Sequence, residues 1–274
     1  MASFFKTITE AIRYYEENGF DSIEKLETWI ERIKKSAYAE LVPESVLNET
    51  LNAALRNIYT KQIDRGQILK MHPEASQFTV NKLKPKLRAE LDRRVAISKG
   101  LIKLNRQQMI EKTTQRFAGW ASSIPDGGSR AVEVKDVKDN IRKAMTQLPF
   151  EERRVLIDQG TKFVGALNEI IAQDGGAIAA EWHIHRAPGY KNRHNHEDRD
   201  GKVYAIRGNW AMEKSLMKAG PAGYYDDITK PGEEVFCSCH VRYMYALREL
   251  PPDMLTIKGQ EALDEVRKKR QAAK

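Results

Sequence analysis

Histidine and cysteine are concentrated in one short stretch of this chain. Five of the six histidines and both cysteines fall within the 58 residues from His183 to His240. They follow the pattern H-x-H, H-x-H, C-x-C-H. Imidazole nitrogen and thiolate sulfur are the ligands that a tetrahedral zinc site uses. This stretch is therefore predicted to fold so that several of these side chains meet at one metal.

The residues around the cluster predict a small region of short strands and loops. Residues 180–185 alternate apolar and polar side chains, which is typical of a strand, and residues 203–206 and 235–243 predict two more. Glycine and proline between these segments indicate turns and a long loop. We therefore expect a loop-rich domain, which gains stability from a bound metal because its own core is small.

Two histidines and both cysteines form the predicted ligand set. Residues i and i+2 of a strand share a face, so Cys237 and Cys239 can point at one metal. His194 and His196 can do the same if their segment is extended. We predict a structural zinc site formed by these four residues. The alternates are His183, His185 and His240.

The opposing interpretation is that C-x-C arises by chance and that the histidines are exposed or bind polyanions. A disulfide between Cys237 and Cys239 is disfavoured because the ring would be strained. A chain with only two cysteines also fits a reducing compartment.

The first part of the chain is predicted to be helical. Apolar residues recur at helical spacing, with a stop at Gly19 and a cap at Ser22. Pro43 ends the second helix, and a third is expected from Ser45 to near Gly66. These apolar stripes are read as core or helix-pairing faces.

A strongly basic helix is predicted over residues 82–116, with Pro85 in its first turn. Eleven basic and three acidic residues give this segment a net charge of +8, which is that of the whole chain. A concentrated positive field attracts polyanions such as nucleic acid, although an ordinary solvated helix face is the alternative. The side chains expected to contact nucleic acid are Lys82, Lys84, Lys86, Arg88, Arg93, Arg94, Lys99, Lys103 and Arg106.

The clearest break in the chain is the Pro-Asp-Gly-Gly segment within residues 124–129. Two helices are expected after it, residues 134–148 ending at Pro149 and residues 150–173. No apolar run approaches the ~20 residues that a membrane span needs. We predict an α+β protein with three parts: a helical region over 1–124, a small α+β domain over 125–257, and a charged C-terminal helix or tail over 258–274.

Several short motifs resemble those of a known family. Trp182 is followed by Arg193-x-x-His196-x-x-x-Asp200-Gly201-Lys202, and then by Cys237-Ser238-Cys239 and a predicted strand. This order and spacing resembles the C-terminal domain of the phage head morphogenesis family, the Mu F-like minor head proteins. The resemblance covers about residues 163–250, which is a third of the chain.

The chain departs from the family pattern at two places. Phe236 and Ser238 stand where the N-C-R-C motif has Asn and Arg. Some members carry a second C-x-x-C or C-x-x-H pair, and here that pair falls on Arg193 and His196. Since arginine is no ligand, the resemblance makes His194 the substitute.

The resemblance implies a minor capsid protein without enzymatic activity. Such a protein would lie inside the virion near the portal and would be in the host cytoplasm during assembly. Its expected partners are the portal protein, other head proteins and double-stranded DNA bound without sequence preference. It could also leave the head with the genome.

Two other functions stay open at this point. A zinc-dependent hydrolase or toxin-like enzyme would use the His/Cys cluster with Glu181 or Glu197 as general base, although H-E-x-x-H is absent from the sequence. A cellular zinc protein that binds nucleic acid would need a recognition helix, and no helix-turn-helix spacing is present.

Overall fold

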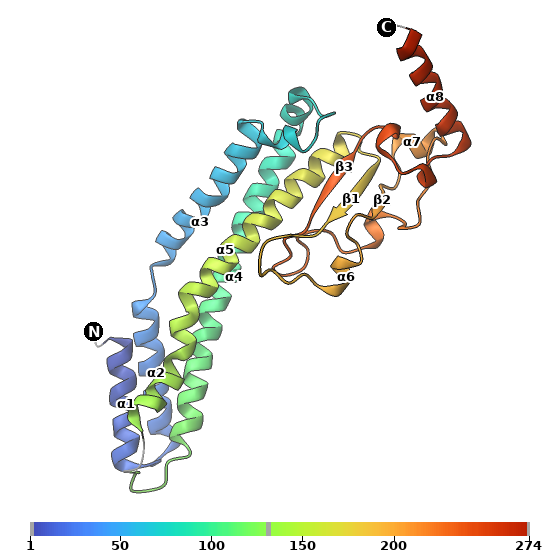
Figure 1. Cartoon of the computed structure of the whole chain (residues 1–274). Coiled ribbons are helices and arrows are strands. Elements are labelled where there is room, and N and C mark those ends of the chain that lie inside the picture. Colours follow the sequence, from blue (N-terminus) through green and yellow to red (C-terminus); the bar gives the residue numbers. More distant parts are fainter. Residues whose placement is uncertain (1–2, 130–132, 273–274) are drawn as a thin grey trace. The chain divides into compact units, whose positions relative to one another are not determined.

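The chain folds into long helices followed by a small sheet (Figure 1). The structure is a computed structural model, and it describes residues 3–129 and 133–272. The fold confirms the predicted α+β class with a helical N-terminal region. The chain forms two compact units, Met1–Asn52 with Ala96–Leu156 and Ala53–Val95 with Ile157–Lys274. The loop at 124–129 lies within unit 1, and the predicted domain boundaries stay predictions.

Unit 1 begins with two capped helices, α1 (Phe4–Asn18) and α2 (Ile23–Glu40). The hydroxyls of Ser3 and Ser22 accept hydrogen bonds from the backbone three residues further on, which satisfies donors that a helix start leaves free. Gly19 ends α1 with φ at +78°, in the left-handed region that favours glycine. These ends agree with the sequence.

The core of unit 1 is apolar and aromatic. Its fully buried side chains come from α1, α2 and the later part of α4 (Gln77–Ala121), and they include Ile8, Ile12, Tyr15, Ile33 and Phe117. This is the burial that the helical spacing of apolar residues predicts.

Two prolines lie inside long helices, which corrects the predicted ends. Pro85 is inside α4, which begins at Gln77, and not in a first turn. Pro149 does not end a helix, because α5 runs without a break over Val134–Asp174. In unit 1 the apolar face of α5 includes the buried Ile141 and Leu148. Continuous burial of such a face offsets the roughly 3 kcal/mol that an interior proline costs.

Unit 2 contains an antiparallel sheet in the order β2-β1-β3. The central strand β1 (Ala179–His183) pairs with β2 (Val203–Ala205) and with β3 (His240–Met244). Trp182, Tyr204 and Tyr243 belong to its buried core.

The other elements of the chain are α3 (Glu44–Tyr59), the π-helix η1 (Thr60–Asp64), α6 (His194–Glu197), α7 (Trp210–Glu213), α8 (Ile257–Ala272), and the 3-10 turns η2 (Gln67–Lys70), η3 (Tyr225–Asp227), η4 (Leu247–Glu249) and η5 (Pro252–Met254).

The third strand is shorter than predicted. It begins at His240, so Cys237 and Cys239 lie in the loop before it. Phe236 has φ at +59°, a left-handed conformation that breaks an extended strand.

None of the helices within 3–129 and 133–272 combines the length and apolar character that a membrane span requires.

Candidate metal centre

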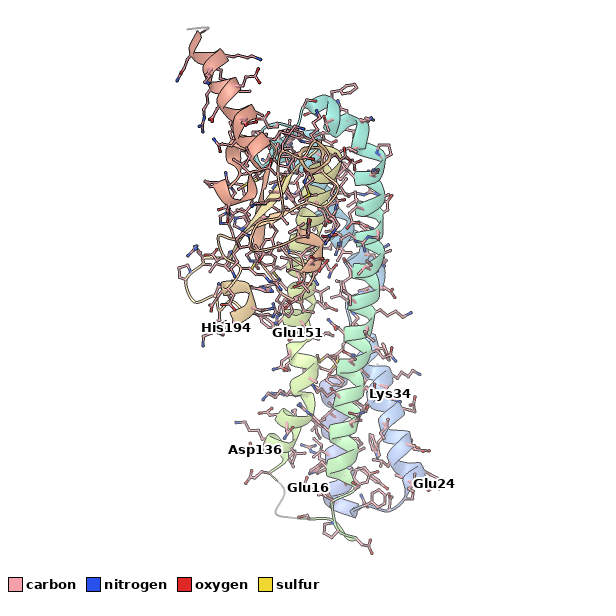
Figure 2. All side chains as sticks on the ribbon, turned by 90° about the vertical axis from the view of Figure 1, so that its right-hand side faces the viewer. Glu16, Glu24, Lys34, Asp136, Glu151 and His194 are labelled. Carbon is pink, nitrogen blue, oxygen red and sulfur yellow. The ribbon has the colours of Figure 1, made fainter. Side chains whose placement is uncertain are left out.

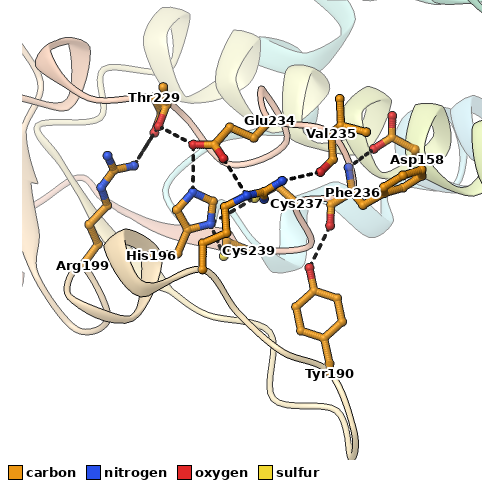
Figure 3. A network of polar contacts seen from close by, with 11 residues as sticks. Asp158, Tyr190, His196, Arg199, Thr229, Glu234, Val235, Phe236, Cys237 and Cys239 are labelled. Carbon is orange, nitrogen blue, oxygen red and sulfur yellow. Dashed lines mark hydrogen bonds and ion pairs between the residues drawn. The ribbon is translucent and has the colours of Figure 1, made fainter.

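Three side chains of unit 2 form a buried cluster of metal-ligand type (Figure 3). The Nδ1 atom of His196 lies 3.5 Å from the Cys239 sulfur and 3.8 Å from the Cys237 sulfur. All three ligand atoms lie within 4.8 Å of one another. Both cysteines are free thiols. The group could hold a metal ion, because nitrogen and sulfur donors at such separations can close on one ion with small side-chain movements.

Two local turns bring these ligands together. His196 lies on α6, whose backbone bonds include one of 3.0 Å from Glu197 N to Arg193 O. On the cysteine side, the Cys237 N–H bonds the Glu234 carbonyl, so the chain turns before it reaches β3. The side chain of Asp158 on α5 accepts the Phe236 N–H at 2.7 Å and holds this turn in place.

His194 does not join the cluster, which corrects the predicted extended pair. Residues i and i+2 of a helix point about 200° apart, so α6 buries His196 and exposes His194. The His194 side chain is 90% exposed, and its Nδ1 atom lies 3.3 Å from Asp198 Oδ2. Figure 2 shows His194 on the outside of the ribbon. A hydrogen bond at its own backbone and the charge of Asp198 raise the pKa of His194.

The alternate histidines are engaged elsewhere. His183 and His240 face each other across β1 and β3, with stacked rings 5.4 Å apart. The ring of His185 meets that of Tyr190 edge to face, with centroids 4.8 Å apart. None of the three belongs to the ligand group found among the described residues.

A carboxylate orients the His196 ring from the outside. Its Nε2 atom donates to Glu234 Oε1 at 3.2 Å, which leaves the Nδ1 lone pair facing the thiols. Arg193 lies 2.9 Å from the same carboxylate. Burial raises the pKa of Glu234, but the hydrogen bond from His196 and the charge of Arg193 outweigh it, so the pKa is lowered. A carboxylate behind the histidine is the usual outer contact of a metal-bound imidazole.

The two thiols hold their protons unequally. The hydrogen bond from Cys239, with help from nearby backbone N–H groups and His196, lowers the pKa of Cys237 to about 5. The same hydrogen bond, burial and the charge of Cys237 raise the pKa of Cys239. The arrangement therefore favours the thiolate at Cys237 over Cys239, and thiolate is the form that binds metal.

Aromatic and polar side chains surround His196. The buried ring of Trp182 meets the His196 ring with centroids 5.3 Å apart, and the guanidinium of Arg199 lies 5.1 Å from the Trp182 ring. Arg199 also donates to Thr229, whose hydroxyl donates to Glu234 at 3.3 Å. These contacts help to fix the Glu234 carboxylate and the His196 ring in position.

The residues that carry the family resemblance converge on the cluster. Arg193 contacts Glu234 and donates to the Val235 carbonyl at 2.8 Å. Asp200 accepts the Ile184 N–H at 3.0 Å, and Gly201 donates its N–H to the Trp182 carbonyl at 2.8 Å. The segment from Arg193 to Gly201 is thereby tied both to the end of β1 and to the cysteine loop.

The nine basic residues expected to bind nucleic acid have different surroundings. Six form ion pairs: Lys84 with Asp64, Lys86 with Asp174, Arg88 with Asp92, Arg93 and Arg94 with Glu90, and Arg106 with Glu152. Arg94 and Arg106 are also buried. Lys82, Lys99 and Lys103 form no ion pair with any residue that the structure describes.

Sequence reasoning missed Glu234 and assigned no role to His72. Glu234 could have been found only as an acidic residue near C-x-C, which is a weak signal. His72 is fully buried, with Nδ1 2.5 Å from the Tyr245 hydroxyl and Nε2 2.9 Å from Asn168 Oδ1. A lone histidine in a loop carries no pattern that predicts such long-range bonds.

A scan against protein-family models and searches of curated proteins and solved structures find no match to this chain. Its function is therefore inferred from its own residues and their geometry.

Proposed function

We propose that the chain is a minor head protein of a tailed bacteriophage that docks at the portal and contacts packaged DNA without sequence preference. A structural zinc centre formed by His196, Cys237 and Cys239 holds its docking region together. The supporting observation is that the motif residues Arg193, His196, Asp200 and Gly201 tie one segment to β1 and to the cysteine loop.

Zinc fits the ligand set better than harder metals. Two thiolates and one imidazole are soft and borderline donors, whereas magnesium and calcium take oxygen ligands. A bound ion joins residue 196 to residues 237 and 239, and so closes a loop of about forty residues in a region with only three short strands. Closing a loop of this length stabilises a small core.

The direct test is the composition of phage particles. Particles purified by density gradient from the host that carries the gene, and treated with nuclease and protease, should contain this chain in low copy number by mass spectrometry. Cross-links to the portal protein should exceed those to the major head protein. Recovery of the chain only in the soluble cell fraction would contradict the proposal.

A zinc hydrolase is the second candidate, because the cluster supplies three protein ligands. Catalytic zinc sites keep three protein ligands, and two cysteines with one histidine are a known set. Neither general base expected from the sequence is placed at the cluster: Glu181 pairs with Arg242 at 2.8 Å, and the Glu197 side chain is exposed. The test compares zinc-loaded protein with its Cys237→Ser/Cys239→Ser variant on ester, amide and phosphodiester substrates. If the zinc-loaded protein cleaves none of them faster than the variant does, this candidate is excluded.

A further inference from the structure

The indole N–H of Trp182 is a buried donor in the core that contains both cysteines. The Trp182 side chain is fully buried, and it belongs to the same core as Cys237 and Cys239. Its Nε1 atom has no hydrogen-bond partner of ordinary geometry among the residues that the structure describes. A buried N–H group without an acceptor costs free energy, so almost every such group in a folded protein has one. An unpaired donor at this place therefore indicates an acceptor close by.

The sheet places Trp182 on the same face as one of the two cysteines. Trp182 of β1 is paired with Val241 of β3, and Cys239 comes two positions before Val241. From residue 239 to residue 243 the odd positions are buried and the even positions are exposed, so Cys239 and Val241 point to the same side. A diagonal neighbour on one face of an antiparallel pair lies within reach of an aromatic side chain. The register therefore places the indole against Cys239.

Two contacts agree with this placement. The Trp182 ring meets the ring of His196 edge to face, with centroids 5.3 Å apart. The hydrogen bond with Cys237 raises the pKa of Cys239 most, and a hydrogen bond from the Trp182 side chain acts in the opposite direction. Since Nε1–H is the only polar group of an indole, that bond runs from Nε1–H to the Cys239 sulfur. Trp182 thus borders two of the three candidate ligands.

The strength of this bond depends on the state of the sulfur. A thiol sulfur is a weak acceptor, which explains why the indole donor lacks a bond of ordinary geometry. A metal-bound thiolate carries negative charge, and hydrogen bonds to charged acceptors are roughly twice as strong as neutral ones. The same N–H group therefore stabilises the metal-bound form of Cys239 more than the free thiol.

We propose that Trp182 is a positioning residue of the metal centre, and that its indole N–H donates to the Cys239 sulfur when that sulfur binds the metal as a thiolate. The inference rests on the metal centre of the proposed function, and it adds a donor that raises the metal affinity of that centre. The buried Trp182 then has a role besides packing. The unpaired N–H group and the sheet register point to it independently.

Cobalt(II) bound to the full chain tests the inference, because its charge-transfer absorption reports the electron density at the sulfur ligands. Replacement of Trp182 by benzothienylalanine keeps the shape of the ring and removes only the N–H group. Cobalt affinity should fall about tenfold, as it does when other outer contacts of metal ligands are lost. The thiolate-to-cobalt band should move to longer wavelength, since a thiolate without this donor gives charge to the metal more easily. The d–d bands should stay in place, because the ligands are unchanged.

Two encoded variants complete the comparison. Trp182→Phe also lacks the N–H group, and its charge-transfer band should move in the same direction. The matched control is Trp210→Phe, which changes a tryptophan of α7 that is 36% exposed and belongs to the same unit. This control should keep the wild-type band position and cobalt affinity.

Each outcome has a definite meaning. If the benzothienylalanine protein keeps the wild-type band and affinity, Trp182 only packs against the ligands and the inference fails, while the metal centre stands. A loss of affinity without any movement of the band also contradicts the inference, because loss of packing alone predicts that result. If wild type binds no cobalt with thiolate-to-metal absorption, the metal centre of the proposed function fails together with the inference. Should Trp182→Phe not fold, the benzothienylalanine protein, which keeps the ring, decides.

Discussion

His194 and His196 are separated by one residue and have opposite environments. His196 is buried beside Cys237 and Cys239, whereas His194 is exposed beside Asp198. The difference arises because their segment forms a helical turn, in which i and i+2 diverge, and not a strand, in which they align. The identity of a ligand therefore depends on local backbone conformation as much as on residue type.

Substitution of these two histidines should show which of them binds the metal. His196→Ala should lower zinc affinity by more than about 100-fold, since even outer contacts of metal ligands contribute 10–100-fold. His194→Ala should keep wild-type affinity and serves as the matched control. Competition with a chromophoric chelator measures both. Equal losses in the two variants would show that α6 rearranges to use His194.

The buried His72 should make stability depend on pH. Burial lowers the pKa of His72, although its bond to Asn168 acts in the opposite direction. In the unfolded chain, the pKa of this histidine is near 6.5. As pH falls below about 6.5, the unfolded chain therefore binds more protons than the folded chain does. Stability should therefore fall by up to about 1.4 kcal/mol per pH unit below that value.

Urea unfolding of wild type and His72→Gln at pH 7.5 and 5.5 measures this dependence. The variant should be less stable at pH 7.5, because it alters the bonds to Tyr245 and Asn168, but its stability should change less with pH. Identical pH slopes in both proteins would assign the dependence to other groups.

At the scale of elements, the acidic side chains around helix α4 reduce the positive charge that this helix presents. Its sequence has a net charge of +8 over residues 82–116, yet acidic side chains from other elements, such as Asp64, Asp174 and Glu152, pair with several of its cations. A neighbouring carboxylate lowers the net positive charge that a phosphate meets at such a cation. The basic helix therefore offers fewer phosphate contacts than its sequence predicts.

The salt dependence of the proposed DNA binding tests that number. Three unpaired lysines predict a slope of log K against log salt of about −3, whereas all nine basic residues would give about −8. The triple variant of Lys82, Lys99 and Lys103 to Gln should bring the slope close to zero. A control triple variant at the exposed Lys6, Lys35 and Lys135 should leave it unchanged. Fluorescence anisotropy with a duplex at 50–300 mM salt is suitable, and a slope that the first variant does not alter would contradict this assignment.

At the scale of the whole molecule, the chain forms two compact units and the candidate ligands all belong to one of them. Unit 1 has its own aromatic and aliphatic core, which includes Phe4, Tyr15 and Phe117. Metal binding should therefore stabilise unit 2 in particular, because a ligand stabilises the state that binds it.

Chelation should lower the thermal stability of unit 2 selectively. Zinc at 100 times its Kd contributes about 2.7 kcal/mol, which is lost when EDTA removes it. Calorimetry with and without EDTA should show one shifted component, and the Cys237→Ser/Cys239→Ser variant should show no shift. An EDTA effect of the same size in that variant would mean that the metal binds elsewhere.

Helix starts, stops and apolar faces could be predicted from the sequence because local rules govern them. Ser22 caps α2 and Gly19 ends α1 through bonds to residues only a few positions away. The α+β class also follows from local alternation, and the location of the His/Cys cluster follows from the concentration of these residues within 58 positions.

Contacts between distant segments decided the rest. Pro149 lies inside α5 because apolar side chains of this helix are buried both before and after the proline. Their burial outweighs the local cost of a proline inside a helix. Glu234 orients His196 across 38 positions, and Asp158 holds the Phe236 turn across 78. By itself, the sequence determined which residue types were available to bind a metal. Only the tertiary structure selected His196 over His194, because only folding determines which side chain is buried against Cys237 and Cys239.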